Sequence, residues 1–149
     1  SRSRSREIAA DALEDLGLGD HAEQYPHALS GGMRQRVSLA RTLAAGTRTW
    51  LLDEPFGALD ALTRTRLQRE LDAVRRTRGA SVLLVTHDLD EALLLADRVL
   101  IASPRPMRIA AEVRVDLERP TDAATTTDPR FVTAKRALIG ALAGAGAAT

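Results

Sequence analysis

The 149-residue sequence predicts an α/β domain in which a largely parallel sheet is flanked by helices. Short apolar runs at residues 49–52 and 81–85 are bounded by turn residues, as is typical of buried parallel strands. Stretches with apolar residues at helical spacing lie before, between and after these runs. Strands that alternate with helices are expected to pair in parallel, with the helices covering the sheet.

The first expected helices have recognisable start and stop residues. Apolar residues at helical spacing predict a helix over residues 8–16. Ser30 is expected to cap a second helix, which ends near Gly46. A third helical stretch spans residues 60–78 and stops at Gly79, a residue type that favours helix ends.

The rest of the chain is expected to add helices and two more strands. Asp88 at a capping position predicts a helix after the strand at 81–85. Residues 99–102 and 109–115 predict strands joined by a proline-containing turn. Helical spacing over 131–142 predicts a last helix, and the Gly/Ala-rich tail beyond it is expected to fray.

Composition excludes several classes of function. A formal net charge of +1 gives no electrostatic reason to expect a nucleic-acid partner. Aromatic residues make up only 3% of the chain, which argues against base-stacking surfaces. The sequence has no cysteine, so it has neither disulfides nor thiolate metal sites.

Residues 29–33, with the sequence LSGGM, place a serine and two glycines at an expected helix start. The backbone N–H groups of Ser30, Gly31 and Gly32 would have little side-chain cover, and the helix dipole adds partial positive charge there. This arrangement suits contact with a phosphate. Taken alone, a plain capped helix with a flexible entry is the better explanation, because serine and glycine are common in turns. Gln35, further along, is assigned to the helix surface.

Ionisable side chains follow both expected parallel strands. Asp53 and Glu54 come directly after one strand, and His87 follows the other. Open α/β sheets bind ligands at this edge; one carboxylate suits Mg²⁺ and the next can polarise a water. His87 could hydrogen-bond a terminal phosphate. Taken singly, solvated acids that cap a turn and a structural histidine are the alternatives.

The order and spacing of these elements resemble the ABC ATPase family over essentially the whole chain. Residues 29–33 resemble the family signature, and residues 51–53 resemble its Walker B strand. Glu54 stands where the family has its catalytic glutamate. Residues 57–60 (GALD) are similar to the D-loop, and His87 falls at the switch histidine.

The resemblance implies a P-loop NTPase-like partial domain over residues 1–149, the C-terminal portion of a nucleotide-binding domain. Residues 1–46 would close the helical subdomain, 47–116 form the core strands, and 117–149 the C-terminal loop and helix. In the family, two subunits sandwich two nucleotides. The implied ATP contacts are Ser30, Gly31, Gly32 and Asp60, with Asp53 in the Mg²⁺ shell and Glu54 and His87 as the catalytic residues.

Met33, in place of the commoner glutamine, and the run at residues 103–106 resemble the nitrate, sulfonate and taurine importer branch. In that branch the subunit energises uptake with transmembrane permease subunits and a solute-binding protein. The implied partners are therefore a second ATPase subunit in a dimer, the permease and the solute-binding protein. The implied location is the cytoplasm, peripheral on the inner face of the cell membrane.

The sequence contains no Walker A loop, because its one lysine, Lys135, follows no glycine-rich run. We therefore expect the isolated chain neither to hydrolyse ATP nor to fold robustly, with apolar strand residues exposed. The alternative is a non-catalytic module that pairs with a full-length ATPase subunit and offers its signature in trans. A DNA-repair ATPase of the same superfamily is disfavoured, since the sequence has no heptad run and no cysteine.

Overall fold

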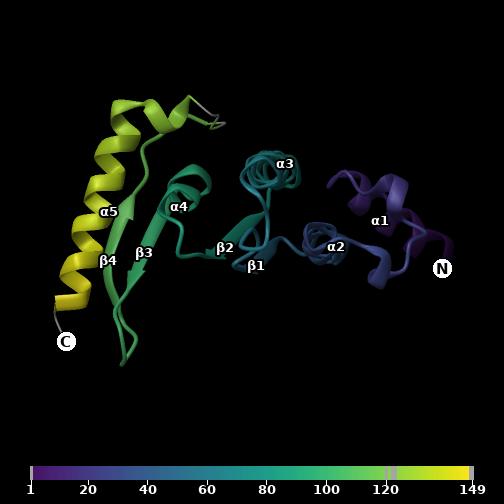
Figure 1. Ribbon diagram of the computed structural model, residues 1–149, viewed down its shortest axis with the longest axis horizontal. Coiled ribbons are helices and arrows are strands. Elements are labelled where there is room, and N and C mark those ends of the chain that lie inside the picture. Colours follow the sequence, from purple (N-terminus) through teal and green to yellow (C-terminus); the bar gives the residue numbers. More distant parts are fainter. Residues whose placement is uncertain (1, 120, 122–123, 148–149) are drawn as a thin grey trace. The chain divides into compact units, whose positions relative to one another are not determined.

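The computed structural model describes residues 2–119, 121 and 124–147, and the chain divides into two compact units, Ser1–Val85 and Thr86–Thr149. Helix and strand alternate from α2 to β3 as expected, and β4 follows β3 directly (Figure 1). The first unit contains α1 (Arg2–Glu14), η1 (Gly19–His21), η2 (Pro26–Ala28), α2 (Gly31–Ala44), β1 (Thr49–Asp53), α3 (Ala61–Arg78) and β2 (Ser81–Val85). The second contains α4 (Leu89–Leu95), β3 (Arg98–Ala102), β4 (Ile109–Arg114), η3 (Thr125–Thr127) and α5 (Pro129–Ala147).

Capping residues set the helix limits in the first unit, as the sequence predicted. The Ser30 hydroxyl accepts a hydrogen bond from the Met33 N–H at 3.2 Å and starts α2. Gly46, with φ +67°, follows the end of that helix. Gly79 ends α3 in the left-handed conformation, with φ +59°.

The strands β1 and β2 pair in parallel, in register from Thr49 with Ser81 to Asp53 with Val85. One face of β1 is buried through Trp50 and Leu52, and the Trp50 indole N–H donates to the Thr47 carbonyl at 3.0 Å. The opposite face is apolar and open: the exposed fractions are 71% for Leu51, 55% for Leu83 and 53% for Val85. The expectation of exposed apolar strand residues is confirmed.

The strands β3 and β4 form a separate antiparallel sheet in the second unit. Only a short proline turn joins them, and a short connection reverses the chain, whereas a parallel pairing needs a long crossover. In that unit α5 lies along the hairpin and also contacts α4 (Figure 1). The shared apolar core consists of Leu93, Ile101, Leu117, Phe131, Leu138 and Ala145.

The terminal helices are longer than the hydrophobic spacing predicts. The helix α1 begins at Arg2, although most of its residues are exposed. The helix α5 continues to Ala147, so the expected fraying after residue 142 is wrong for the described part of the tail. Alanine is the best helix former, and Ala145 packs against the core of the second unit, which offsets the cost of the neighbouring glycines.

Candidate functional site

The first turn of α2 combines a capping serine with two glycines. Ser30 has extended backbone angles and caps the Met33 N–H, while the earlier N–H groups of the helix have no partner within it. Gly31 is exposed. A Cβ on Gly32 would lie 3.0 Å from the Leu59 side chain, so a larger residue here would require that side chain to shift by a few tenths of an ångström. The expected phosphate-type helix start therefore has the required local geometry.

The Walker B-like acids lie at the carboxyl end of β1. Asp53 is the last strand residue and is exposed. Because side chains alternate along a strand, Asp53 shares the open face with Leu51. Asp53 pairs across the sheet with Val85, another exposed residue of the parallel pair. A carboxylate placed here is available to a cation, which would have to complete its shell with water and phosphate oxygens.

Glu54 adopts a left-handed backbone with φ +44°, and it is half-buried. A non-glycine residue in this region costs about 1–3 kcal/mol and persists only where neighbours hold it. Its N–H donates to the Val85 carbonyl of β2 at 2.9 Å, and its own carbonyl accepts the Gly57 N–H at 3.3 Å. The backbone of this acid is thus fixed on both sides, as is common at functional sites.

Gln35 contacts the same segment, which the sequence reading missed. Its side-chain amide donates to the Pro55 carbonyl at 2.9 Å and approaches the Glu54 carbonyl at 3.4 Å. The assignment of Gln35 to the helix surface is therefore wrong. A signal was present, because Gln35 precedes the buried Leu39 and Leu43 at four-residue steps and so lies on the inward face of α2.

Asp60 closes the D-loop-like segment and starts α3. Its carboxylate accepts the backbone N–H groups of Leu62 at 3.1 Å and Thr63 at 3.0 Å. The hydrogen bond from Thr63 is the main reason that the pKa of Asp60 lies below its ordinary value. Asp60 therefore fixes the end of this segment, and its contact with ATP stays a prediction.

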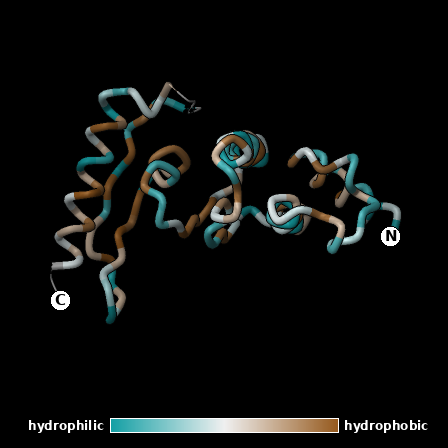
Figure 2. Tube along the Cα trace, in the orientation of Figure 1, coloured by the Kyte–Doolittle hydropathy of each residue, from teal (hydrophilic) through white to brown (hydrophobic). Residues whose placement is uncertain are grey.

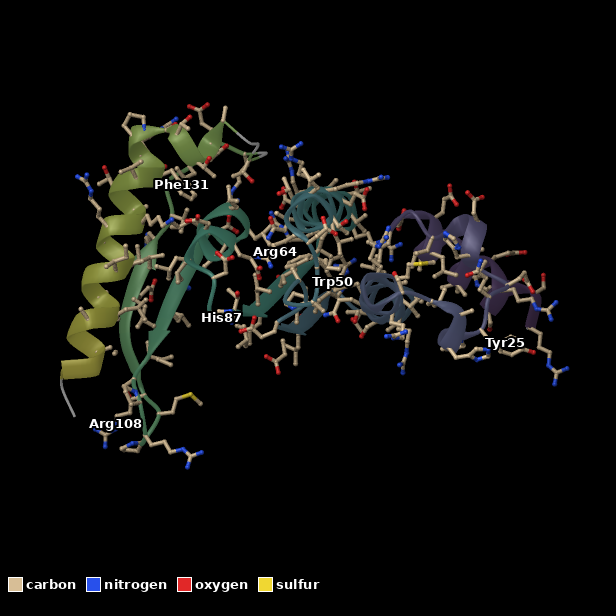
Figure 3. All side chains as sticks on the ribbon, in the orientation of Figure 1. Tyr25, Trp50, Arg64, His87, Arg108 and Phe131 are labelled. Carbon is tan, nitrogen blue, oxygen red and sulfur yellow. The ribbon has the colours of Figure 1, made fainter. Side chains whose placement is uncertain are left out.

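His87 belongs to the second unit, in the turn that leads into α4 (Figure 3). The side chain is exposed. On either side the turn is ordered locally: the Asp88 N–H donates to the Thr86 hydroxyl at 3.0 Å, and the Asp88 carboxylate caps α4. The signature turn, the acid pair and Asp60 all lie in the first unit, whereas His87 lies in the other.

Side chains of the kinds that bind metals occur among the described residues of each unit. Among the described residues, no group of three or more histidine, cysteine, aspartate or glutamate side chains is placed to hold a metal ion. Mg²⁺ is commonly bound through one or two carboxylates together with waters and substrate phosphates. Asp53 supplies one such carboxylate. In the described part of the chain, no helix is long and apolar enough to cross a membrane.

A capped glycine helix start and an acid pair after a parallel strand are features that phosphate-binding α/β proteins share. Comparison with known proteins narrows this class. A family model described as "ABC transporter" matches residues 2–57. The chain resembles the ABC transporter family, and its relatives include ATP-binding proteins of sulfonate and nitrate importers.

Three curated relatives illustrate this kinship. An aliphatic sulfonates import ATP-binding protein of Streptomyces avermitilis is 49% identical over 134 residues, which is 90% of this chain and 50% of the relative. The Mycobacterium avium protein of that description is 53% identical over 120 residues, 80% of this chain and 47% of the relative. A nitrate import ATP-binding protein of Synechococcus elongatus is 47% identical over 121 residues, 80% of this chain and 18% of the relative.

A solved structure supports the fold. The chain matches an ABC transporter of metal-chelate type in an inward-facing conformation, with a TM-score of 0.65 and 24% sequence identity. The match covers 88% of this chain and 48% of the solved chain. The chain also spans about half the length of the sulfonate import relatives. The prediction of a partial ABC ATPase-type α/β domain is confirmed.

Proposed function

We propose that this chain supplies the signature and water-activating part of an ATP-hydrolysing subunit that energises an ABC importer. The observation that carries the proposal is the acid pair Asp53–Glu54 at the carboxyl end of β1, with Glu54 held in a fixed left-handed backbone. The sulfonate and nitrate import relatives support an importer of small anions as the assembly. The Walker A contacts that anchor the phosphates come from outside this sequence.

Each proposed residue has a separate task. Bound Mg²⁺–ATP supplies the γ-phosphoryl group that is transferred to water. Glu54 orients the attacking water and accepts its proton, and Asp53 holds the water shell of the cation. His87 donates a hydrogen bond to the γ-phosphate.

The start of α2 is proposed to stabilise negative charge on the nucleotide phosphates and to take no part in proton transfer. The N–H groups of Gly31 and Gly32, with the Ser30 hydroxyl, face a nucleotide held mainly by a second ATPase subunit. Asp60 lies at the same dimer contact. We further propose that the assembly includes transmembrane permease subunits and a solute-binding protein, and that this chain is peripheral on the cytoplasmic face of the membrane.

The proposal is tested by restoring the missing phosphate contacts. We define the joined protein as this full chain preceded by the part of the Streptomyces avermitilis relative that lies before the match. The joined protein is expected to hydrolyse ATP with Mg²⁺, whereas the 149-residue chain alone shows no activity. Glu54→Gln should lower kcat by about 10²–10⁴-fold, the usual contribution of a positioned base. Glu23→Gln, in an exposed connection, is the matched control.

The outcomes separate the two candidate functions. Steady-state hydrolysis by the isolated chain, abolished by Glu54→Gln, would contradict the composite site. An inactive joined protein that still captures an intact ATPase subunit in an ATP-dependent and Ser30-dependent manner would favour the non-catalytic module. The capped start of α2, complete within this chain, is the observation that keeps this second candidate open. Absence of both hydrolysis and capture would remove both functions.

A further inference from the structure

We propose that Gln35 is a positioning residue that couples the signature helix α2 to the backbone of Glu54 within one subunit. This inference rests on the proposed function, because it assigns to Gln35 the task of holding the water-activating acid. It goes beyond that function, because it concerns a contact between α2 and the Glu54 backbone inside one subunit. Two contacts between α2 and residues 54–59 carry it.

The first contact is the Gln35 amide group. It donates to the Pro55 carbonyl at 2.9 Å and lies 3.4 Å from the Glu54 carbonyl. Gln35 is half-buried, so water competes only weakly for these acceptors. Nineteen residues separate Gln35 from Glu54, and the contact therefore joins two elements rather than neighbours in the chain.

The Glu54 backbone needs such a support. With φ +44° it occupies a conformation that side-chain-bearing residues avoid. The Val85 carbonyl holds its N–H, and the Gly57 N–H and Gln35 hold the carbonyl side. Removal of the Gln35 contact leaves the tight turn with one fewer anchor on the side that faces α2. Because the backbone angles of Glu54 aim its carboxylate, relaxation of the turn would move that carboxylate.

The second contact joins α2 to the same segment at another position. Gly32 approaches Leu59 so closely that an added Cβ would lie 3.0 Å from the Leu59 side chain. Gly32 and Gln35 lie one turn apart on the same face of α2. The helix therefore touches both ends of the segment from Glu54 to Leu59. In the proposed assembly the start of α2 contacts nucleotide. A shift of α2 would therefore move the Glu54 backbone.

The test uses the joined protein defined above and the variant Gln35→Met, which keeps a similar volume but cannot donate. We expect kcat for ATP to fall about 10-fold to 100-fold, because small misplacements of catalytic groups cost rates of this order. The KM for ATP should change less than about 2-fold, since Gln35 contacts no substrate. In the Glu54→Gln background the same change should have no further effect on kcat. Gln24→Ala, in the exposed connection before α2, is the control.

A second readout does not depend on hydrolysis. Amide hydrogen exchange in Gln35→Met should accelerate at Glu54 and Gly57, whose N–H groups flank the turn, with unchanged exchange at Leu52 inside β1. If the joined protein is inactive, the proposed function fails and exchange alone decides the link. Unchanged exchange at both amides, or an equal loss of kcat on top of Glu54→Gln, would overturn the proposal. If Gln35→Met unfolds, Gln35→Glu gives the same test, because a carboxylate also lacks the donor.

Discussion

The two compact units differ in how far their strands are covered by other elements. In the second unit, α5 packs against the β3–β4 hairpin and contacts α4, and Phe131 and Leu138 are almost fully buried. In the first unit, the parallel pair buries Trp50 on one face and leaves Leu51 and Leu83 open on the other. Figure 2 shows apolar strand segments in both units, so hydropathy alone does not separate them. The difference lies in what covers the strands.

The comparison separates the contacts that stabilise the second unit from those that position the proposed site residues in the first unit. The second unit is held by a contiguous apolar core. The segments with proposed function in the first unit combine buried apolar residues, Phe56 and Leu59, with directional contacts. These contacts are the Glu54 N–H to the Val85 carbonyl, the Gln35 amide to the Pro55 carbonyl, and the Asp60 cap. Directional bonds fix backbone angles, which a reactive acid requires, while their net contribution to stability is small.

The largest expected effect is the loss of the core of the second unit. Phe131→Ala should lower the free energy of unfolding by about 3–5 kcal/mol, because it removes an aromatic ring from a closed site and leaves a cavity. Denaturant unfolding followed by circular dichroism measures this. The neighbouring Val132→Ala is the control, since Val132 is 38% exposed. Equal costs for both changes would show that this core is not closed.

The open face of the first unit should respond oppositely. The double change Leu51→Thr and Leu83→Lys should alter the unfolding free energy by less than about 0.5 kcal/mol, since both side chains are exposed. It should also reduce self-association at high concentration, measured by light scattering, because it removes exposed apolar surface from an open strand pair. The matched control Leu52→Ala, on the buried face, should cost about 2–5 kcal/mol. A comparable loss from the double change would mean that the face is covered.

The smallest expected effect is a difference in how the pKa values of two helix-capping acids, one in each unit, respond to salt. The pKa of Asp60 is lowered mainly by the backbone N–H of Thr63, and that of Asp128 mainly by the hydrogen-bonded guanidinium of Arg130. Both folded pKa values lie below the ordinary 3.8. Each acid therefore contributes stability that is fully present above that value and is lost as the pH falls through the folded pKa.

Salt should change the pKa values of the two acids by different amounts. Raising the ionic strength to about 1 M, where the screening length is about 3 Å, should move the Asp128 pKa upwards more than the Asp60 pKa. Carboxyl-carbon NMR titration measures both in one sample. Arg130→Gln should raise the pKa of Asp128 and leave that of Asp60 unchanged. A larger salt response at Asp60 would contradict the assigned causes.

Most local structure could be predicted from the sequence, because its signals are local. Ser30 and Asp60 cap helices through their own side chains, and Gly79 ends α3 in a conformation that glycine tolerates. The parallel pairing of β1 with β2 followed from their short apolar runs and the helix between them. The end of α5 was misplaced, because the packing of Ala145 on a distant core decides it.

By itself, the sequence determined the resemblance to ABC transporter ATP-binding proteins, the order of the elements, and the positions of Ser30, Asp53 and Glu54 relative to those elements. Such features depend on residue type and spacing along the chain. Only the tertiary structure decided that Glu54 is left-handed, that the Gln35 amide donates to the Pro55 carbonyl, and that Gly32 lies close to Leu59. These facts arise from contacts between segments far apart in the chain, which spacing does not encode.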